Sequence, residues 1–153
     1  MNPSDEDMVI GVQGQLWCEG VRCFDDVTYD LFPKCLGIFE RGWNARPEYP
    51  DGVGAAFEDF YAQICSAEMP YFMSEGINFR LPPVGMKMVD GVIDFNLPAH
   101  IEGAVVRYTV DGTDPVASSP VLEKGQSFEK GTTIKARLFL DGVHSITSTL
   151  IVK

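Results

Sequence analysis

The chain has 153 residues, of which 45% are hydrophobic, and its formal net charge is −10. This apolar share is enough for a folded core, and the length allows one ordinary domain or two small ones. The negative charge argues against binding to nucleic acid or to anionic membrane surfaces, because both require clustered Lys and Arg side chains. No apolar run reaches the roughly 18 to 20 residues that a membrane-spanning helix needs, so we expect no membrane insertion.

The cysteines and histidines do not form a metal-binding pattern. All four cysteines, Cys18, Cys23, Cys35 and Cys65, lie in the first half of the chain, whereas both histidines lie in the second half. The spacing of zinc ligands is therefore missing, and we expect neither a metal nor a cofactor. Cys18 and Cys23 flank the same loop and could pair under oxidising conditions.

Residues 8–12 (MVIGV) form a short apolar run with β-branched side chains, which predicts a buried strand. Trp17 and Glu19 follow this run, and in a (β/α) architecture active sites are built at that end of a strand. An indole and a carboxylate two residues apart suit a sugar, because the flat ring covers its C–H face and the acid accepts hydrogen bonds from its hydroxyls. The alternative, from these two residues alone, is a core tryptophan beside a solvated acid.

Helices are expected in the rest of the first half. Apolar residues recur at helical spacing over residues 29–43, where Asp25 or Asp26 can cap the start and Pro33 either kinks the helix or begins a second one. A short helix is expected around residues 70–74. Another helix is expected to carry the apolar residues Phe57, Phe60, Tyr61 and Ile64. We expect the aromatic side chains of these helices to form a core rather than a ligand site.

The character of the chain changes at residues 81–85 (LPPVG), which have the composition of a linker. After the linker, apolar and polar residues alternate, as in residues 134–140, and Asp-Gly pairs begin at positions 90, 111 and 141. These features predict short strands joined by hairpin turns, in a small immunoglobulin-like antiparallel β-sandwich. Asp111 and Asp114 fit a turn better than a calcium site.

Several segments resemble family-20 glycoside hydrolases, the β-N-acetylhexosaminidases and chitobiases. In chain order these segments are residues 11–19 (GVQGQLWCE), 25–33 (DDVTYDLFP), 39–43 (FERGW), 75–83 (EGINFRLPP) and 108–115 (YTVDGTDP). The first three look like the C-terminal part of the family. The last two are similar to the junction and the small β-domain that close many bacterial members, so the resemblance covers nearly the whole chain.

The resemblance implies a fold of mixed class, α/β plus all-β. Residues 1–80 would be the last βα segment of a (β/α)₈ barrel with extra helices, residues 81–85 a linker, and residues 86–153 the C-terminal β-sandwich. In this family, hydrolysis retains the anomeric configuration and the substrate's own 2-acetamido group is the nucleophile. Trp17 would form the floor of the pocket for a terminal N-acetylhexosamine, and Glu19 would accept hydrogen bonds from its O4 and O6 hydroxyls.

The catalytic Asp-Glu pair of the family, which follows two glycines, has no counterpart in this sequence. The chain contains no Gly-Gly pair, and its adjacent acids at 5–7, 25–26 and 58–59 fall in an acidic leader, a helix cap and a helix face. Length points the same way, because a barrel of this type needs at least about 200 residues. We therefore expect no catalytic residue and no hydrolase activity in the isolated chain, with the other pocket walls coming from the rest of the barrel in a parent chain.

The expected function is that of a C-terminal fragment of an exo-acting hexosaminidase that acts on N-acetylhexosamine-containing glycans. One alternative is a non-catalytic β-sandwich for support or glycan binding with a helical cap, and another is an unrelated interaction domain. Because a barrel fragment exposes its barrel-facing surface, the isolated chain is expected to self-associate. The family suggests a periplasmic, cell-surface or secreted bacterial enzyme. Residues 1–7 lack the basic and apolar regions of a signal peptide, so if the parent protein is exported, its signal lies upstream of this segment.

Overall fold

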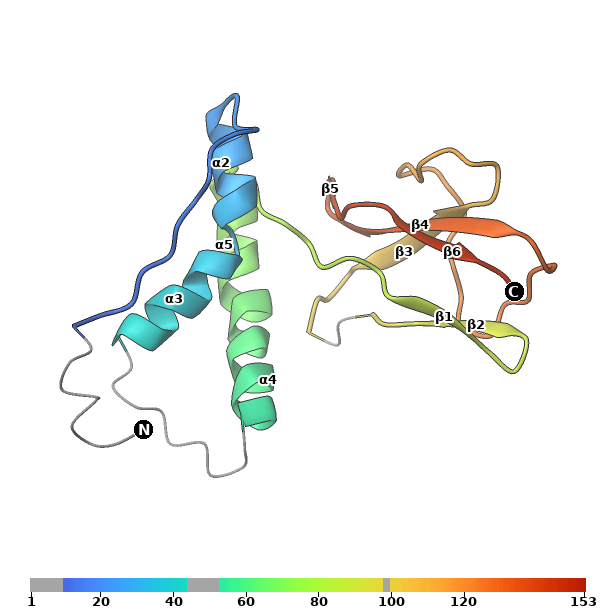
Figure 1. The fold of residues 1–153 in the computed structure, drawn as a ribbon, viewed down its shortest axis with the longest axis horizontal. Coiled ribbons are helices and arrows are strands. Elements are labelled where there is room, and N and C mark those ends of the chain that lie inside the picture. The colour runs from blue at the N-terminus through green and yellow to red at the C-terminus, as the bar shows by residue number, and fades with distance from the viewer. Residues whose placement is uncertain (1–9, 44–52, 98–99) are drawn as a thin grey trace. The chain divides into compact units, whose positions relative to one another are not determined.

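The computed structural model describes residues 10–43, 53–97 and 100–153 (Figure 1). The chain divides into two compact units, Met1–Phe79 and Arg80–Lys153. Helices make up the first unit and antiparallel sheets the second, which is compatible with the predicted small β-sandwich. The assignment of residues 1–80 to a barrel, and of the sheets to the immunoglobulin type, remains a prediction.

The first two helices are separated by a proline. Helix α2 spans Phe24–Leu31 and helix α3 spans Lys34–Trp43. Pro33 lies between them after a cis peptide bond. Proline cannot continue a helix but is tolerated at its start, so the second of the two predicted outcomes is the one observed.

The second helical stretch runs without a break from α4 to α5 (green in Figure 1). Helix α4 spans Val53–Gln63, a π-helical turn η1 spans Ile64–Glu68, and helix α5 spans Met69–Ser74. The wider turn precedes Pro70, whose ring would clash with the carbonyl of residue 66 in a regular α-helix. The sequence predicts both helices but not the turn that joins them. Among the described residues, no helix is both long and apolar enough to cross a bilayer.

Aromatic side chains from three segments form the core of the first unit. The ring of Phe72 in α5 lies 4.5 Å from that of Phe32 and 5.7 Å from that of Phe79, measured between centroids. Phe79 and Met69 are almost fully buried beside them. The side-chain amide of Asn78 donates a hydrogen bond of 3.2 Å to a backbone carbonyl at the start of α2, which ties the end of the unit to that helix.

Other aromatic side chains of this unit remain exposed, so the prediction that they form a core is only partly right. Those with more than half of their surface exposed are Trp17, Phe24, Phe39, Trp43, Phe57 and Tyr71. The helices therefore carry more aromatic surface than the core of this unit takes up.

The strand predicted at residues 8–12 is not present in the part of the chain that the structure describes. Residues 10–12 have no regular secondary structure, and both Ile10 and Val12 are exposed. Residues 8 and 9 lie outside the described ranges. The reason is physical, because a lone strand cannot satisfy its backbone N–H and C=O groups without neighbouring strands.

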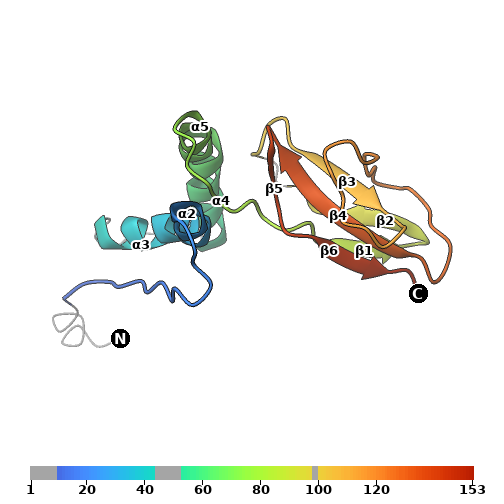
Figure 2. The same ribbon diagram turned by 90° about the horizontal axis from the view of Figure 1, so that it is seen from above.

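The second unit contains two antiparallel sheets. The smaller sheet is a hairpin of β1, Met86–Val89, and β2, Val92–Phe95. In the larger sheet, β4 lies between β3 and β6 (Figure 2), and its end pairs with β5. These four strands are β3, Val105–Thr109; β4, Thr133–Leu140; β5, Val143–His144; and β6, Ser148–Ile151.

The alternation predicted for β4 is confirmed. Ile134, Ala136, Leu138 and Leu140 are all buried, whereas the residues between them are only partly covered. Because successive side chains of a strand point to opposite faces, one face of β4 forms the core and the other faces outward.

Two of the three predicted Asp-Gly turns are hairpin turns. Residues 90–91 join β1 to β2, and residues 141–142 join β4 to β5. All four of these residues have a positive φ, as a type I′ turn requires. Residues 111–112 instead begin a longer loop, which returns to β3 through a bridge between Val121 and Arg107. The hairpin predicted at this third position is therefore wrong.

Candidate functional site

The two residues predicted to bind sugar lie in the segment that leads into α2. This segment has no regular secondary structure. Trp17 is 76% exposed, and Glu19 is exposed as well. Directly after them the backbone turns, and the Val21 N–H donates a hydrogen bond of 3.2 Å to the carbonyl of Cys18. The structure thus leaves the indole and the carboxylate open to solvent.

A carboxylate of α2 holds the end of this segment. The Arg22 backbone N–H donates a 2.8 Å hydrogen bond to the side chain of Asp26, and this bond lowers the pKa of Asp26. The N-cap residue is Cys23, which makes no side-chain capping bond. The prediction that an aspartate is the N-cap residue is therefore wrong. Asp26 lies inside the first turn of α2 and accepts a hydrogen bond from a backbone N–H outside the helix. A carboxylate in the first turn is still favoured by the helix dipole.

Residues 11–16 lie against α3, with a glycine at the closest point. A Cβ atom built on Gly14 would clash with Cδ1 of Ile38, so a larger residue at this position would require the end of that side chain to move. The same segment, together with Phe39 and Trp43, lines a hollow of about 520 Å³. Neither Trp17 nor Glu19 reaches this hollow.

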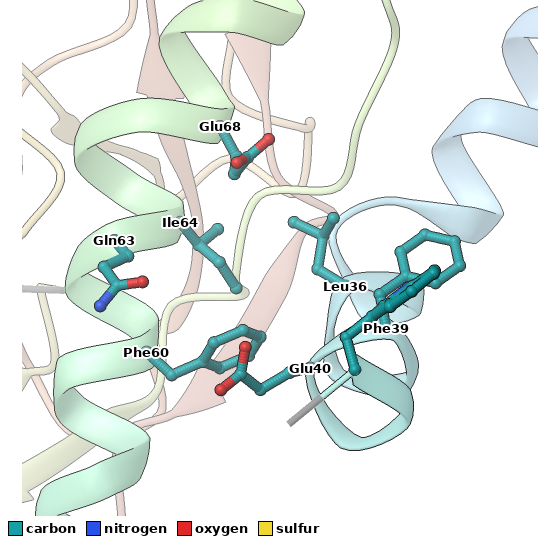
Figure 3. A pocket seen from close by; sticks show the side chains of 8 residues that line it. Leu36, Phe39, Glu40, Phe60, Gln63, Ile64 and Glu68 are labelled. Atoms are coloured by element: carbon teal, nitrogen blue, oxygen red, sulfur yellow. The ribbon is translucent and has the colours of Figure 1, made fainter. Parts of the chain in front are cut away.

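A groove of about 240 Å³ lies between α3 and the stretch formed by α4 and η1 (Figure 3). Leu36 of α3 faces Phe60 and Ile64 across it, and Phe39 also lines it, so its walls are mainly apolar. The carboxylates of two glutamates, at positions 40 and 68, also line it. The sequence does not predict this groove, because its walls come from two helical stretches that are separate along the chain.

The cysteines of the chain are all free thiols. Cys18 and Cys23, which could pair according to the sequence, are both exposed and unpaired. Burial raises the pKa of the Cys35 and Cys65 thiols. A nucleophilic cysteine needs a lowered pKa, so neither of the two inner thiols is prepared for catalysis.

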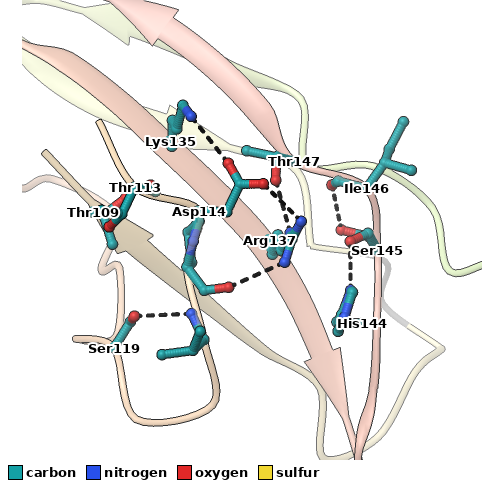
Figure 4. A network of polar contacts seen from close by, with 12 residues as sticks. Thr109, Thr113, Asp114, Ser119, Lys135, Arg137, His144, Ser145, Ile146 and Thr147 are labelled. Atoms are coloured by element: carbon teal, nitrogen blue, oxygen red, sulfur yellow. Dashed lines mark hydrogen bonds and ion pairs between the residues drawn. The ribbon is translucent and has the colours of Figure 1, made fainter. Parts of the chain in front are cut away.

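The acids that resemble a calcium site are held by protein groups, as Figure 4 shows for Asp114. Asp111 accepts hydrogen bonds from the hydroxyl and the backbone N–H of Thr113, which lower its pKa, so the predicted turn is confirmed there. Asp114 instead pairs with Lys135 at 3.0 Å and Arg137 at 2.9 Å. The hydrogen bond from Lys135 is the main cause of the lowered pKa of Asp114. Within the described ranges, no group of three or more His, Cys, Asp and Glu side chains could hold a metal ion.

A second hollow, of about 380 Å³, lies on the outer face of the larger sheet. Arg107, Arg137, Phe139 and His144 contribute to its lining. The sequence places Arg107 and Arg137 on the polar face of their strands. It does not predict the strand register, which makes them direct partners across β3 and β4, so sequence reasoning missed this site.

The match with a known domain covers the sheet region. Residues 89–149 match the family model of the chitobiase/beta-hexosaminidase C-terminal domain. The chain is 27% identical over 128 residues to a beta-hexosaminidase of Vibrio vulnificus, and 28% identical over 119 residues to an N,N'-diacetylchitobiase of Vibrio harveyi. The predicted resemblance is thus confirmed, and the chain is similar to the C-terminal part of a β-hexosaminidase.

Both relatives are much longer than this chain. Each alignment covers 67% of the chain, but only 15% of the Vibrio vulnificus protein and 13% of the Vibrio harveyi protein. The chain therefore spans only a small part of the length of either relative.

Proposed function

We propose that this chain is the C-terminal fragment of an exo-acting β-N-acetylhexosaminidase of glycoside hydrolase family 20. The parent enzyme removes terminal N-acetylhexosamine from glycans with retention of configuration, and the 2-acetamido group of the substrate acts as nucleophile. The observation that carries this proposal is the similarity to a β-hexosaminidase and a chitobiase together with the matched C-terminal domain. The fragment supplies part of the sugar pocket but not the catalytic Asp-Glu pair.

In this proposal the first unit is the end of the catalytic barrel. The exposure of Ile10 and Val12 supports it, because β-branched side chains in an extended segment are normally covered by neighbouring strands of a parallel sheet. When the remaining strands are present, residues 8–12 pair with them and become buried. Trp17 and Glu19 then stand at the end of that strand, which is where barrel enzymes build their sites.

The pocket chemistry follows from the two side chains. The Trp17 indole covers the C–H face of the terminal sugar, and the Glu19 carboxylate accepts hydrogen bonds from its O4 and O6 hydroxyls. Interactions that hold the distorted sugar stabilise the transition state, so they raise kcat as well as affinity. Both side chains are open to solvent in the described structure, which leaves them accessible to a ligand.

The first test uses the parent enzyme and a chromogenic β-N-acetylglucosaminide. Trp17→Ala is expected to lower kcat/KM by at least about tenfold, because it removes the apolar contact with the sugar. Glu19→Gln is expected to lower it by about tenfold to one hundredfold, since it removes a charged acceptor. Phe24→Ala is the matched control, because Phe24 is 73% exposed in the same unit. Unchanged kinetics for Trp17→Ala would reject the pocket role.

The second test uses the isolated chain with the same substrate. No turnover is expected, because the catalytic acid and its partner lie outside this sequence. Turnover by purified chain, with host enzymes excluded by a mock purification, would contradict the fragment proposal.

The alternative is a non-catalytic module in which the sheets support the protein or bind glycan and the helices form a cap. The buried face of β4 favours it, because the alternate apolar side chains of this strand are already covered in the given chain. The sequence upstream of Met1 in the full reading frame separates the two. A Gly-Gly-Asp-Glu segment there supports the enzyme, and its absence supports the module.

A further inference from the structure

The hollow on the outer face of the larger sheet has no role in the proposed function. It lies within the second unit and has a volume of about 380 Å³. Its lining combines the guanidinium groups of Arg107 and Arg137 with the rings of Phe139 and His144. This hollow and the proposed sugar pocket therefore belong to different units, and binding at each can be tested separately.

The strand register brings like charges together in this hollow. Arg107 is the direct partner of Arg137 between β3 and β4, and like charges at such positions are unfavourable. Asp114 offsets only part of the charge, because its single carboxylate is shared between Arg137 and Lys135 (Figure 4). Asp141 is the acid in the lining of the hollow itself. Three cations thus face two carboxylates on this side of the sheet.

Arg107 is the cation best placed to receive an anion. Its Nη1 donates a hydrogen bond of 2.6 Å to the carbonyl of Ser119. Arg107 makes no ion pair with any of the described residues. A guanidinium group has five N–H donors and binds a carboxylate through two parallel hydrogen bonds. Most of these donors therefore remain for a ligand.

An aromatic pair lies next to the arginines. Phe139 is the register partner of His144, and their ring centroids are 5.7 Å apart. Nδ1 of His144 donates to the carbonyl of Ser145 at 3.0 Å, because a carbonyl oxygen can only accept. Nε2 of the neutral ring is then an acceptor for a hydroxyl group. An aromatic face beside a hydroxyl acceptor fits the C–H face and the hydroxyls of a pyranose.

We propose that this hollow binds a hexuronate, a sugar ring that carries one carboxylate, either free or at the end of a glycan. The carboxylate pairs with the Arg107 guanidinium, the ring lies on Phe139, and a hydroxyl donates to His144. The chain as a whole carries a charge of −10, so long-range attraction does not assist an anion. Binding therefore depends on direct contacts, and we expect a Kd of about 1 mM.

The test is an amide NMR titration of the full chain with sodium glucuronate, and with glucose and sodium acetate at matched ionic strength. Glucuronate is expected to cause saturable shifts confined to β3, β4 and β5. Glucose and acetate are each expected to bind at least about tenfold more weakly, because each lacks one half of the recognised group. No saturable shift with glucuronate overturns the proposal. If acetate binds as tightly as glucuronate, the proposed contact with the sugar ring is wrong. If glucose binds as tightly as glucuronate, the proposed contact with the carboxylate is wrong.

Variants separate direct contact from general charge. Arg107→Gln is expected to weaken glucuronate binding by at least about tenfold, because a charged hydrogen-bond pair is lost. Lys130→Gln removes the same charge from an exposed position outside the hollow and is expected to leave binding unchanged. Phe139→Val keeps a strand-forming residue and removes the ring, so it is expected to weaken binding as well. An equal loss in Arg107→Gln and Lys130→Gln overturns the proposal, because net charge then explains the binding.

Discussion

The two units of this chain differ in how completely they bury their large apolar side chains. In the second unit, alternate residues of β4 are buried, and Leu138 is only 1% exposed. In the first unit, Phe72 and Phe79 are buried, but Trp43 is 87% exposed on α3. The difference shows that the sheet unit completes its own core, whereas the helical unit carries apolar surface that its own core does not use. Such surface normally marks an interaction site.

The largest expected effect comes from truncating one large apolar side chain in each unit. Leu138→Ala is expected to destabilise the second unit by about 2 to 5 kcal/mol, because it leaves a cavity in a closed core. Trp43→Ala removes a larger side chain but is expected to change stability by less than about 0.5 kcal/mol, because its ring is exposed. Urea unfolding followed by amide NMR reports each unit separately. Similar losses in the two variants would contradict the contrast between the units.

Self-association tests the exposed surface directly. The isolated chain at tens of micromolar is expected to show a light-scattering mass above that of one chain, because exposed aromatic surface on the helices is covered by association. The double variant Trp43→Ser/Phe57→Ser is expected to lower this mass. The control is Val121→Ser/Ile151→Ser, which removes two exposed apolar side chains from the second unit. A monomeric wild type, or an equal effect of the control, would count against the prediction.

Glycine substitutions are expected to have opposite signs in the two units. Gly142 has a φ of 90° in the β4–β5 turn, so Gly142→Ala is expected to cost about 1 kcal/mol in backbone strain. Gly37 lies inside α3, and a Cβ there meets no atom within 4 Å. Gly37→Ala is expected to stabilise the first unit by up to about 1 kcal/mol through helix propensity. The unfolding midpoints of the two units check both signs, and a matching sign would refute the prediction.

The smallest effect is a pH dependence of the second unit. The folded-state pKa of Asp114 lies below its ordinary value of 3.8, so its ion pairs stabilise the folded state above that value. This contribution is lost as the pH falls through the folded-state pKa. Asp114→Asn is therefore expected to lower Tm slightly at neutral pH, with a difference that shrinks toward zero in acid.

The control for this prediction is Asp141→Asn, since Asp141 makes no ion pair within the described residues. Tm measured from neutral pH to about pH 2 gives both profiles. A constant difference between Asp114→Asn and wild type across this range would show that the carboxylate does not act through its charge.

Local patterns explain why the sheet unit was the easier one to predict. The alternation in residues 134–140 and the Asp-Gly pairs at positions 90 and 141 act over a few residues, so the sequence alone indicates their structure. The strand predicted at residues 8–12 fails because a strand needs partners that a local pattern does not supply. The π-helical turn at Ile64–Glu68 was missed because the helical spacing of side chains looks continuous across it.

The candidate sites show the same limit. The order of motifs around Trp17 and Glu19 is enough to predict a sugar contact and the family resemblance. It does not predict the surroundings of these side chains, which depend on polypeptide beyond this segment in the proposed enzyme. The hollow at Arg107 depends on the register between β3 and β4, and single-strand alternation carries no information about register.

The turn η1 also sets the direction in which α5 faces. The backbone N–H of Met69 reaches back five residues to the carbonyl of Ile64, so this turn holds one residue more than an α-helical turn. Each residue rotates a helix by about 100°. Deleting one residue from the turn would swing Phe72 by about that angle, away from the rings of Phe32 and Phe79. A deletion in η1 that leaves the hydrophobicity of the chain unchanged would therefore separate Phe72 from the rings of Phe32 and Phe79.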